Sequence, residues 1–218
     1  MVHTPPGHSV DRMQFVLDLR RRGIMDAVVL RAMEEVPRER FVMADHAGAA
    51  YQDRAMPIAC GQTISQPFVV GYMTEQLMAG PRHHVLEVGT GSGYQAAVLS
   101  RIAARVTSIE RYRTLADAAR IRLMALGYDN VDVIHGDGMA GVPARAPFDR
   151  IIVTAAAETV PQALADQLAV GGIMVLPLGA AGAHQTLLKI MRTVHGLERT
   201  DLIAVRFVPL LPGEARGM

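Results

Sequence analysis

The sequence has 218 residues, half of them hydrophobic, which provides enough apolar surface for one sizeable core. Its 22 Lys and Arg residues nearly balance its 21 Asp and Glu residues. This balance argues against the strongly basic surface with which nucleic-acid-binding proteins replace the counterions around phosphates. We therefore expect one compact domain, no nucleic-acid partner, and a protein or a small molecule as the partner.

The N-terminal region and the cysteine content indicate the cellular setting. The single cysteine, Cys60, cannot form an internal disulfide. Charged residues, among them Asp11, Asp18 and the run Arg20–Arg22, leave no apolar signal segment near the N-terminus. The longest stretch without polar side chains, Leu168–Ala183, is too short to span a bilayer. We therefore expect a cytoplasmic protein without a membrane anchor.

The chain begins with a region that is rich in His, Pro and Gly. Residues 1–9 show no periodicity and are predicted to form a flexible tail, after which a single domain covers residues 10–218. From Val10 onward, apolar residues recur at three-to-four spacing, which predicts two short helices. Pro37 ends the second helix, because proline has no backbone donor.

The helical N-terminal part is predicted to extend over residues 10–80. Within it, Tyr51–Gln66 carries prolines and a glycine among small polar residues and is predicted to be an ordered loop. A helix follows over Phe68–Met78. The segment 57–67, which leads into this helix, is a candidate for a binding loop.

After Gly80 the pattern changes to short apolar runs, which are typical of buried parallel strands. The predicted strands are Val85–Val88, Val106–Glu110, Val131–Ile134, Ile151–Val153 and Ile173–Leu176. The helical stretches between them are Tyr94–Ala103, Thr114–Leu126 and Pro161–Leu168. This alternation predicts right-handed βαβ units and therefore an α/β core, a doubly wound and mostly parallel sheet, over residues 81–179.

The C-terminal part, residues 180–218, contains two further extended segments. Thr186–Thr193 and Leu202–Val208 follow the last crossover helix, so they are candidates for an antiparallel pair. Their order in the sheet is left open by the pattern.

The strongest local motif is Val85–Tyr94, with the sequence VLEVGTGSGY, in which a strand enters a glycine turn and a helix begins. Glycines permit positive φ and the close approach of a ligand to the backbone. The dinucleotide fingerprint requires a glycine where Tyr94 stands, which argues against NAD. Glu87 would place a carboxylate near the mouth of the turn, and this suits an ammonium group better than a pyrophosphate.

Two further segments complete a candidate cofactor site at the same sheet edge. Glu110 ends the second strand, where an acidic side chain can accept both hydroxyls of a ribose. The loop His135–Gly138 follows the third strand and is placed to contact an adenine through Asp137 or Gly138. Together these residues predict a nucleoside-like ligand with an amino-acid tail. The alternatives are a plain tight turn for the glycines, a solvated strand end for Glu110 and a turn-forming role for Asp137.

These motifs resemble those of the protein-L-isoaspartate O-methyltransferases, a family of class I S-adenosylmethionine-dependent methyltransferases. The resemblance covers the chain from about Val10 to Leu211, with Val85–Tyr94 as the first cofactor motif and Val106–Glu110 as the second. It implies a Rossmann-like fold with an N-terminal helical extension, S-adenosyl-L-methionine as cofactor and S-adenosyl-L-homocysteine as product. The implied cofactor-binding residues are Glu87, Gly89, Thr90, Gly91, Ser92, Gly93, Glu110, Asp137 and Gly138.

Two other segments carry the resemblance to the substrate side of the family. Gly61–Pro67, GQTISQP, looks like the family's signature loop, in which the serine matching Ser65 and neighbouring backbone amides bind the isoaspartyl carboxylate. Val205–Leu210 is similar to the C-terminal segment that holds the peptide by its extended backbone. The implied substrate-binding residues are Thr63, Ile64, Ser65, Gln66, Phe207 and Val208.

The resemblance implies a repair reaction. The enzyme would methylate the free α-carboxylate of L-isoaspartyl residues in damaged proteins and peptides, and the ester would collapse to a succinimide that can reopen to normal aspartate. An α-carboxyl group, with a pKa of roughly 3.3 to 3.7, is ionised at neutral pH and needs no general base. Ser65 is therefore expected to position the acceptor and not to attack it. Its alternative role is to cap the helix that starts near Phe68.

Other candidate chemistry is weaker. Cys60 has no recognisable histidine partner and is expected to be structural. His83 and His84 would point to opposite faces of a strand, so no metal site is expected. Two other functions compete with repair: a methyltransferase for a small metabolite or another substrate that lacks isoaspartate, and a protein that binds the cofactor without transferring its methyl group. We expect a monomer.

Overall fold

The structure is a computed structural model that describes residues 6–180 and 182–215, with side chains from residue 12 onward. The N-terminal elements are α1 (Pro6–Arg21), α2 (Ala27–Glu35), η1 (Arg38–Arg40), η2 (Ala44–Ala49), β1 (Met56–Pro57), η3 (Ala59–Gly61), β2 (Thr63–Ile64) and α3 (Pro67–Leu77). The remaining elements are β3 (His84–Val88), α4 (Tyr94–Ser100), β4 (Arg105–Glu110), α5 (Arg113–Ala125), β5 (Val131–His135), η4 (Pro143–Arg145), β6 (Phe148–Val153), α6 (Gln162–Gln167), β7 (Leu168–Leu178), β8 (Gln185–Thr193) and β9 (Gly196–Val205).

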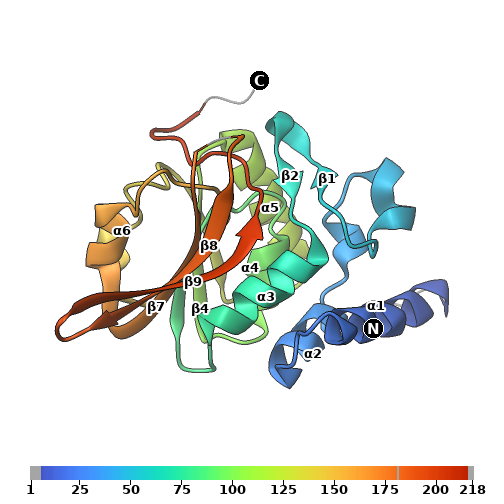
Figure 1. The fold of residues 1–218 in the computed structure, drawn as a ribbon. Coiled ribbons are helices and arrows are strands. Elements are labelled where there is room, and N and C mark those ends of the chain that lie inside the picture. Colours follow the sequence, from blue (N-terminus) through green and yellow to red (C-terminus); the bar gives the residue numbers. More distant parts are fainter. Residues whose placement is uncertain (1–5, 181, 216–218) are drawn as a thin grey trace.

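The described residues form one seven-stranded sheet in the order β5-β4-β3-β6-β7-β8-β9 (Figure 1). The strands from β5 to β7 are parallel to their neighbours, whereas β8 pairs antiparallel with both β7 and β9. The sheet confirms the predicted doubly wound, mostly parallel α/β class, and it confirms that the two C-terminal strands are antiparallel neighbours. The strand order reverses between β3 and β6, which is where α/β proteins bind their ligands.

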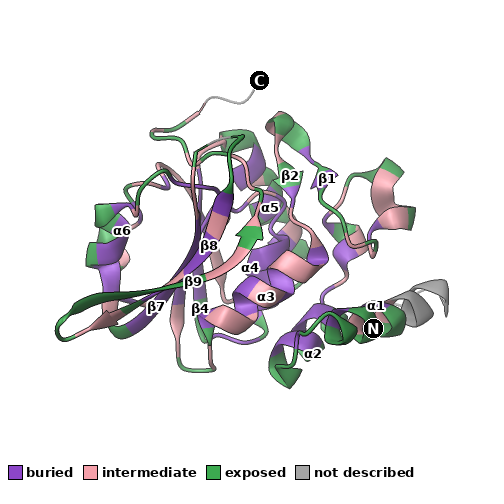
Figure 2. Ribbon diagram, viewed as in Figure 1, coloured by how far each residue is buried: buried purple, intermediate pink, exposed green. Residues whose placement is uncertain are grey.

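Helices cover both faces of the sheet because its central strands are apolar on both sides. Val85 of β3 belongs to the larger core, which also contains residues of α1 to α5, whereas the next residue, Leu86, belongs to the core under α6. This alternation follows from the period of two along a strand. Helices α1 and α2 pack against α3 on the face opposite α6, and Figure 2 shows the central strands buried between the two helical layers.

The elements differ from the predicted ones at places where the local pattern is weak. Residues 6–9, predicted as part of a flexible tail, belong to α1, while residues 1–5 lie outside the described residues. The loop Tyr51–Gln66 contains the antiparallel pair of β1 and β2, with Met56 opposite Ile64. Strand β9 starts at Gly196, whereas the prediction placed its start at Leu202. The first half of the strand was missed because it is an exposed, polar sheet edge without an apolar alternation.

Candidate active site

One cavity lies at the carboxyl edge of the sheet, beside β3, β4 and β6. It receives residues from the glycine turn, the end of β4, the loop after β5, the loop before α3 and the C-terminal segment. The predicted residues that line it are Thr63, Ile64, Ser65, Gly89, Thr90, Gly91, Ser92, Glu110, Gly138 and Val208. The fold therefore brings the predicted cofactor and substrate segments to one place, although they are far apart in the sequence.

The glycine turn after β3 has the backbone conformation that its sequence requires. Gly89, Gly91 and Gly93 all have positive φ, at 96°, 53° and 89°. A Cβ atom at Gly89 would collide with Oγ1 of Thr154, while one at Gly93 would lie 3.2 Å from Cδ1 of Leu123 in α5. Gly93 does not line the cavity, so its small size serves the packing of the turn on α5, and Gly89 and Gly91 are the glycines next to the cavity.

Glu110 is tied to the glycine turn. It is buried, and its Oε2 accepts the backbone amide of Gly91 at 2.9 Å while its Oε1 accepts the amide of Tyr112 at 3.0 Å. The interpretation of Glu110 as a solvated strand end is therefore wrong. A carboxylate offers about four acceptor positions, so Glu110 keeps free lone pairs towards the cavity. These lone pairs fit the two hydroxyls of a ribose.

Glu87 does not lie at the mouth of the glycine turn, where we expected it to face an ammonium group. It is fully buried and does not line the cavity, and it accepts a hydrogen bond from the Ser108 hydroxyl. Its Oε1 has no partner among the described residues. Burial raises the pKa of Glu87 to about 8, with a smaller contribution from the charge of Glu110. The side chain is thus a buried acid beneath the turn, and not the exposed carboxylate that we expected at the mouth.

The loop after β5 reaches the cavity through a glycine. Asp137 does not line the cavity, and its Oδ1 accepts the backbone amide of Met139 at 2.8 Å, which is the turn-forming alternative. Gly138 does line it, and a Cβ atom there would lie 2.7 Å from Cγ1 of Val88. A glycine at position 138 therefore lets the backbone of this loop pack closely on Val88 at the wall of the cavity.

Ser65 is not the cap of the helix that follows it. Helix α3 begins at Pro67, and the backbone amide of Phe68 donates to Oδ1 of Asp53 at 2.8 Å. The Ser65 carbonyl accepts from Nη2 of Arg38 at 2.8 Å, and no hydrogen bond joins the Ser65 hydroxyl to any residue in 6–180 or 182–215. The hydroxyl is therefore available to a ligand.

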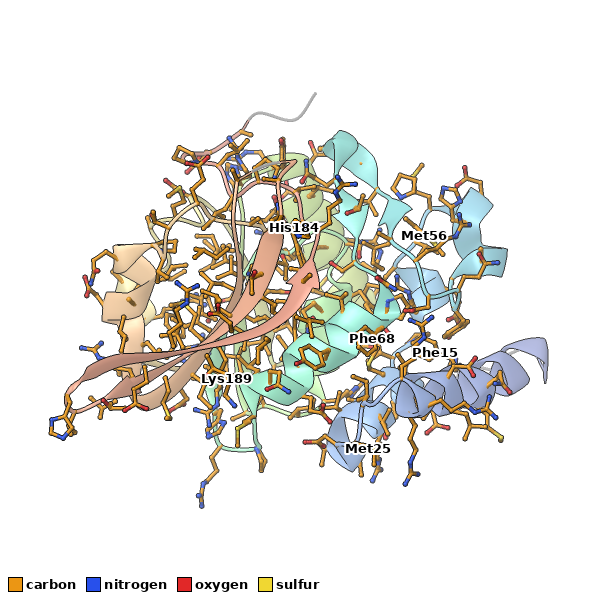
Figure 3. All side chains as sticks on the ribbon, in the orientation of Figure 1. Phe15, Met25, Met56, Phe68, His184 and Lys189 are labelled. Atoms are coloured by element: carbon orange, nitrogen blue, oxygen red, sulfur yellow. The ribbon has the colours of Figure 1, made fainter. Side chains whose placement is uncertain are left out.

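A second groove adjoins the first cavity, and the two share Ser65, Thr63, Thr154 and Val208. Gln66 and Phe207, which the sequence assigned to the substrate, line this groove and not the first cavity. The groove lies between the start of α3 on one side and, on the other, residues 182–184 and the end of β9 with the segment that follows it. Figure 3 labels Phe68 near the start of α3 and His184 just before β8, one residue from either side. The two hollows meet at Ser65.

Residues 11–215 match a family model that is described as protein-L-isoaspartate(D-aspartate) O-methyltransferase. The chain belongs to this family. A protein-L-isoaspartate O-methyltransferase of Rhodopseudomonas palustris, strain BisB18, is 60% identical over 209 residues, which cover 95% of this chain and 96% of the relative. One from a Bradyrhizobium species, strain BTAi1, is 57% identical over 214 residues, which cover 98% of this chain and 100% of the relative.

Solved structures of the methyltransferase family agree with the fold. A protein-L-isoaspartate O-methyltransferase matches 91% of this chain and 65% of its own, with 29% identity and a TM-score of 0.83. A second structure is described as a putative protein-L-isoaspartate O-methyltransferase from Plasmodium falciparum in complex with S-adenosyl-L-homocysteine. It matches 91% of this chain and 97% of its own, with 26% identity and a TM-score of 0.80.

Several cavity residues of this family member were missed by the sequence analysis. They include Gln95, Arg111, Tyr112, Thr154 and Ala155, whereas Pro209 and Leu210 lie in the predicted C-terminal segment Val205–Leu210. Thr154 donates its hydroxyl to the Gly89 carbonyl at 2.7 Å and so braces the glycine turn. A usable signal existed for Thr154, because it directly follows a predicted parallel strand whose carboxyl end must lie at the same sheet edge.

Other predicted features can be placed as well. In residues 6–180 and 182–215, no group of three or more His, Cys, Asp or Glu side chains is arranged to hold a metal ion. Cys60 is a half-buried free thiol with positive φ, at 58°. None of the helices in these ranges is long and apolar enough to cross a membrane.

Proposed function

We propose that this chain transfers a methyl group from S-adenosyl-L-methionine to the free α-carboxylate of L-isoaspartyl residues in damaged proteins and peptides. The observation that carries the proposal is the meeting of two hollows at Ser65, one beside the glycine turn and one beside the C-terminal segment. Membership of the isoaspartate methyltransferase family supports the same reaction. A groove next to the cavity suits an extended peptide better than a small metabolite.

The first cavity fits S-adenosyl-L-methionine. Gly89, Thr90, Gly91 and Ser92 offer backbone and hydroxyl groups around one end of the cavity, and Glu110 offers acceptors for a ribose. Gly138 contributes to the wall of the same cavity. When bound, the cofactor supplies an electrophilic methyl group. Glu87, Gly93 and Asp137, which we also predicted as cofactor-binding, are proposed to act through the turns that they stabilise.

Ser65 is proposed to orient the acceptor. Its free hydroxyl donates to one carboxylate oxygen of the isoaspartyl residue, while the backbone around Thr63 and Ile64 closes one wall of the cavity. Because the carboxylate is already ionised at neutral pH, this site has to position it and exclude water, and it has no proton to remove. Well-aligned positioning is worth up to roughly 7 to 11 kcal/mol.

The second groove is proposed to hold the peptide on either side of the isoaspartyl residue. Gln66, Phe207 and Val208 line it, and Phe207 is itself held by Gln185, whose Oε1 accepts the Phe207 amide at 2.6 Å. A fixed backbone segment can bind peptides of many sequences. This tolerance suits an enzyme that acts on damage in any protein.

We further propose that the protein works in the cytoplasm as a monomer and does not bind nucleic acid. The near balance of 22 basic and 21 acidic residues and the absence of a disulfide-forming cysteine pair support this setting.

A matched pair of peptides tests the reaction. One peptide carries isoaspartate and the other normal aspartate at the same position, and both are incubated with radiolabelled S-adenosyl-L-methionine. We expect base-labile label on the isoaspartyl peptide alone. Label on neither peptide, with cofactor binding intact, would contradict the proposed acceptor.

A further inference from the structure

Arg38 is a buried cation outside both hollows. It lies in η1, its exposed fraction is 0%, and its Nη1 has no partner among the described residues. No ion pair joins it to a carboxylate in the described part of the chain, and burial lowers its pKa below the usual value. Burying a charge in this way is costly, and an apolar side chain of similar volume would fill the space without that cost.

The guanidinium of Arg38 contacts three segments that are far apart in the sequence. Its Nε donates to the Ala50 carbonyl at 2.8 Å, and its Nη2 donates to the Ser65 carbonyl at 2.8 Å. Its central carbon lies 4.6 Å from the centre of the Tyr94 ring, which is close enough for a cation–π interaction. Tyr94 is the first residue of α4, directly after Gly93, and it lines the cofactor cavity.

These contacts connect the two halves of the site. Ser65 lies where the cavity meets the peptide groove, and Tyr94 adjoins the glycine turn, yet neither side chain is hydrogen-bonded to the other. The planar guanidinium has donors in a rigid arrangement and a flat face for stacking, which a lysine cannot reproduce. Arg38 is therefore suited to hold the backbone of one segment at a constant distance from the ring of the other.

We propose that Arg38 is a positioning residue that holds the Ser65 backbone against Tyr94. It thereby aligns the loop before α3, which carries Ser65, with the glycine turn after β3. This inference rests on the proposed function for the identity of the acceptor, but not for the contacts themselves. Arg38 touches neither hollow, so its effect reaches the reaction only through Ser65 and Tyr94.

Hydrogen exchange of the backbone amides at Ile64, Ser65 and Gln66 tests this role without any substrate. In Arg38→Lys we expect these amides to exchange about tenfold faster, because a charge-assisted hydrogen bond to the loop is lost. Amides of the central strands should keep their rates. The matched control is Arg40→Lys, since Arg40 lies in the same short helix but is exposed, and its loop rates should equal those of the wild type.

Arg38→Met is the second variant, because an apolar side chain of similar length avoids the buried charge and supports folding. The proposal is overturned if either folded variant keeps the exchange rates of the loop amides within about twofold of the wild type. It is also overturned if neither variant folds, since Arg38 would then be needed for the fold as a whole.

Binding of an isoaspartyl peptide to the protein loaded with S-adenosyl-L-homocysteine gives the functional readout. We expect the peptide dissociation constant to rise about tenfold in Arg38→Lys, while that of S-adenosyl-L-homocysteine changes by less than about threefold. If the wild type binds no isoaspartyl peptide, the proposed function fails, whereas the exchange rates of the loop still decide the role of Arg38.

Discussion

Asp53 caps helix α3 from outside the helix, because its Oδ1 accepts the backbone amide of Phe68 at 2.8 Å. Its Oδ2 accepts the side-chain amide of Gln66 at 2.9 Å and also pairs with Arg22, which directly follows α1. One carboxylate therefore holds together the start of α3, the residue after Ser65 and the turn that follows α1. This arrangement leaves the Ser65 hydroxyl without a hydrogen-bond partner among the described residues.

Asp53→Ala should reduce stability and weaken peptide binding. The loss of a helix cap costs about 1 kcal/mol, and the freed Gln66 side chain lines the peptide groove. Urea unfolding measures the first effect and peptide titration the second. Asp45→Ala, at an exposed position of η2, serves as the control and should change neither quantity. Equal behaviour of the two variants would speak against the capping role.

Ser65→Ala should lower kcat/KM for an isoaspartyl peptide by about 10- to 100-fold, because a hydrogen bond to a charged group is worth roughly 1.5 to 3 kcal/mol. The free energy of unfolding should change by less than about 0.5 kcal/mol, since the hydroxyl has no partner among the described residues. Steady-state kinetics and urea unfolding check both statements. An unchanged kcat/KM would exclude a role of Ser65 in binding the acceptor. The control is Thr200→Ala on the exposed strand β9, which should leave both quantities unchanged.

Glu110→Gln should weaken the binding of S-adenosyl-L-homocysteine by about tenfold or more. The amide side chain keeps only one acceptor atom, so it loses either the Gly91 or the Tyr112 bond and part of its capacity for a ribose. Isothermal titration calorimetry measures the dissociation constant. Glu198→Gln, on the exposed part of β9, should bind like the wild type. Similar affinities of the two variants would exclude Glu110 from cofactor binding.

Glu87→Gln should make stability less dependent on pH. The pKa of Glu87 is raised from 4.5 to about 8 in the folded protein, so the unfolded chain releases this proton first as pH rises. The contribution of Glu87 to the free energy of unfolding of the wild type is therefore fully present below pH 4.5. It falls as pH rises towards 8, by on the order of a few kcal/mol. Glutamine is neutral throughout and lacks this loss.

Urea unfolding at pH 5 and pH 8 checks the Glu87 prediction. We expect the variant to gain stability relative to the wild type at pH 8 and to differ little from it at pH 5. If the difference in the free energy of unfolding between the two proteins is the same at both pH values, folding does not raise the pKa of Glu87.

The central sheet could be predicted from the sequence because β3, β4 and β6 are buried on both faces. Strands β3 to β6 each contain one of the predicted apolar runs, and the glycine turn follows β3 as expected. Strand β9 could be predicted only in part, since residues 196–201 lie at an exposed sheet edge and carry no apolar pattern. The short pair of β1 and β2 was missed, because each strand has only two residues.

The fold class, the glycine turn and the segments that contribute to the site could be read from the sequence, because periodicity and short motifs are local properties. The role of each polar side chain became clear only from its surroundings in the folded protein. Asp53, and not Ser65, caps α3, Glu87 is buried beneath the turn, and Arg38 bonds to the loop from a distant segment. These roles depend on burial and on partners far away in the chain, and neither is visible in the local pattern of residues.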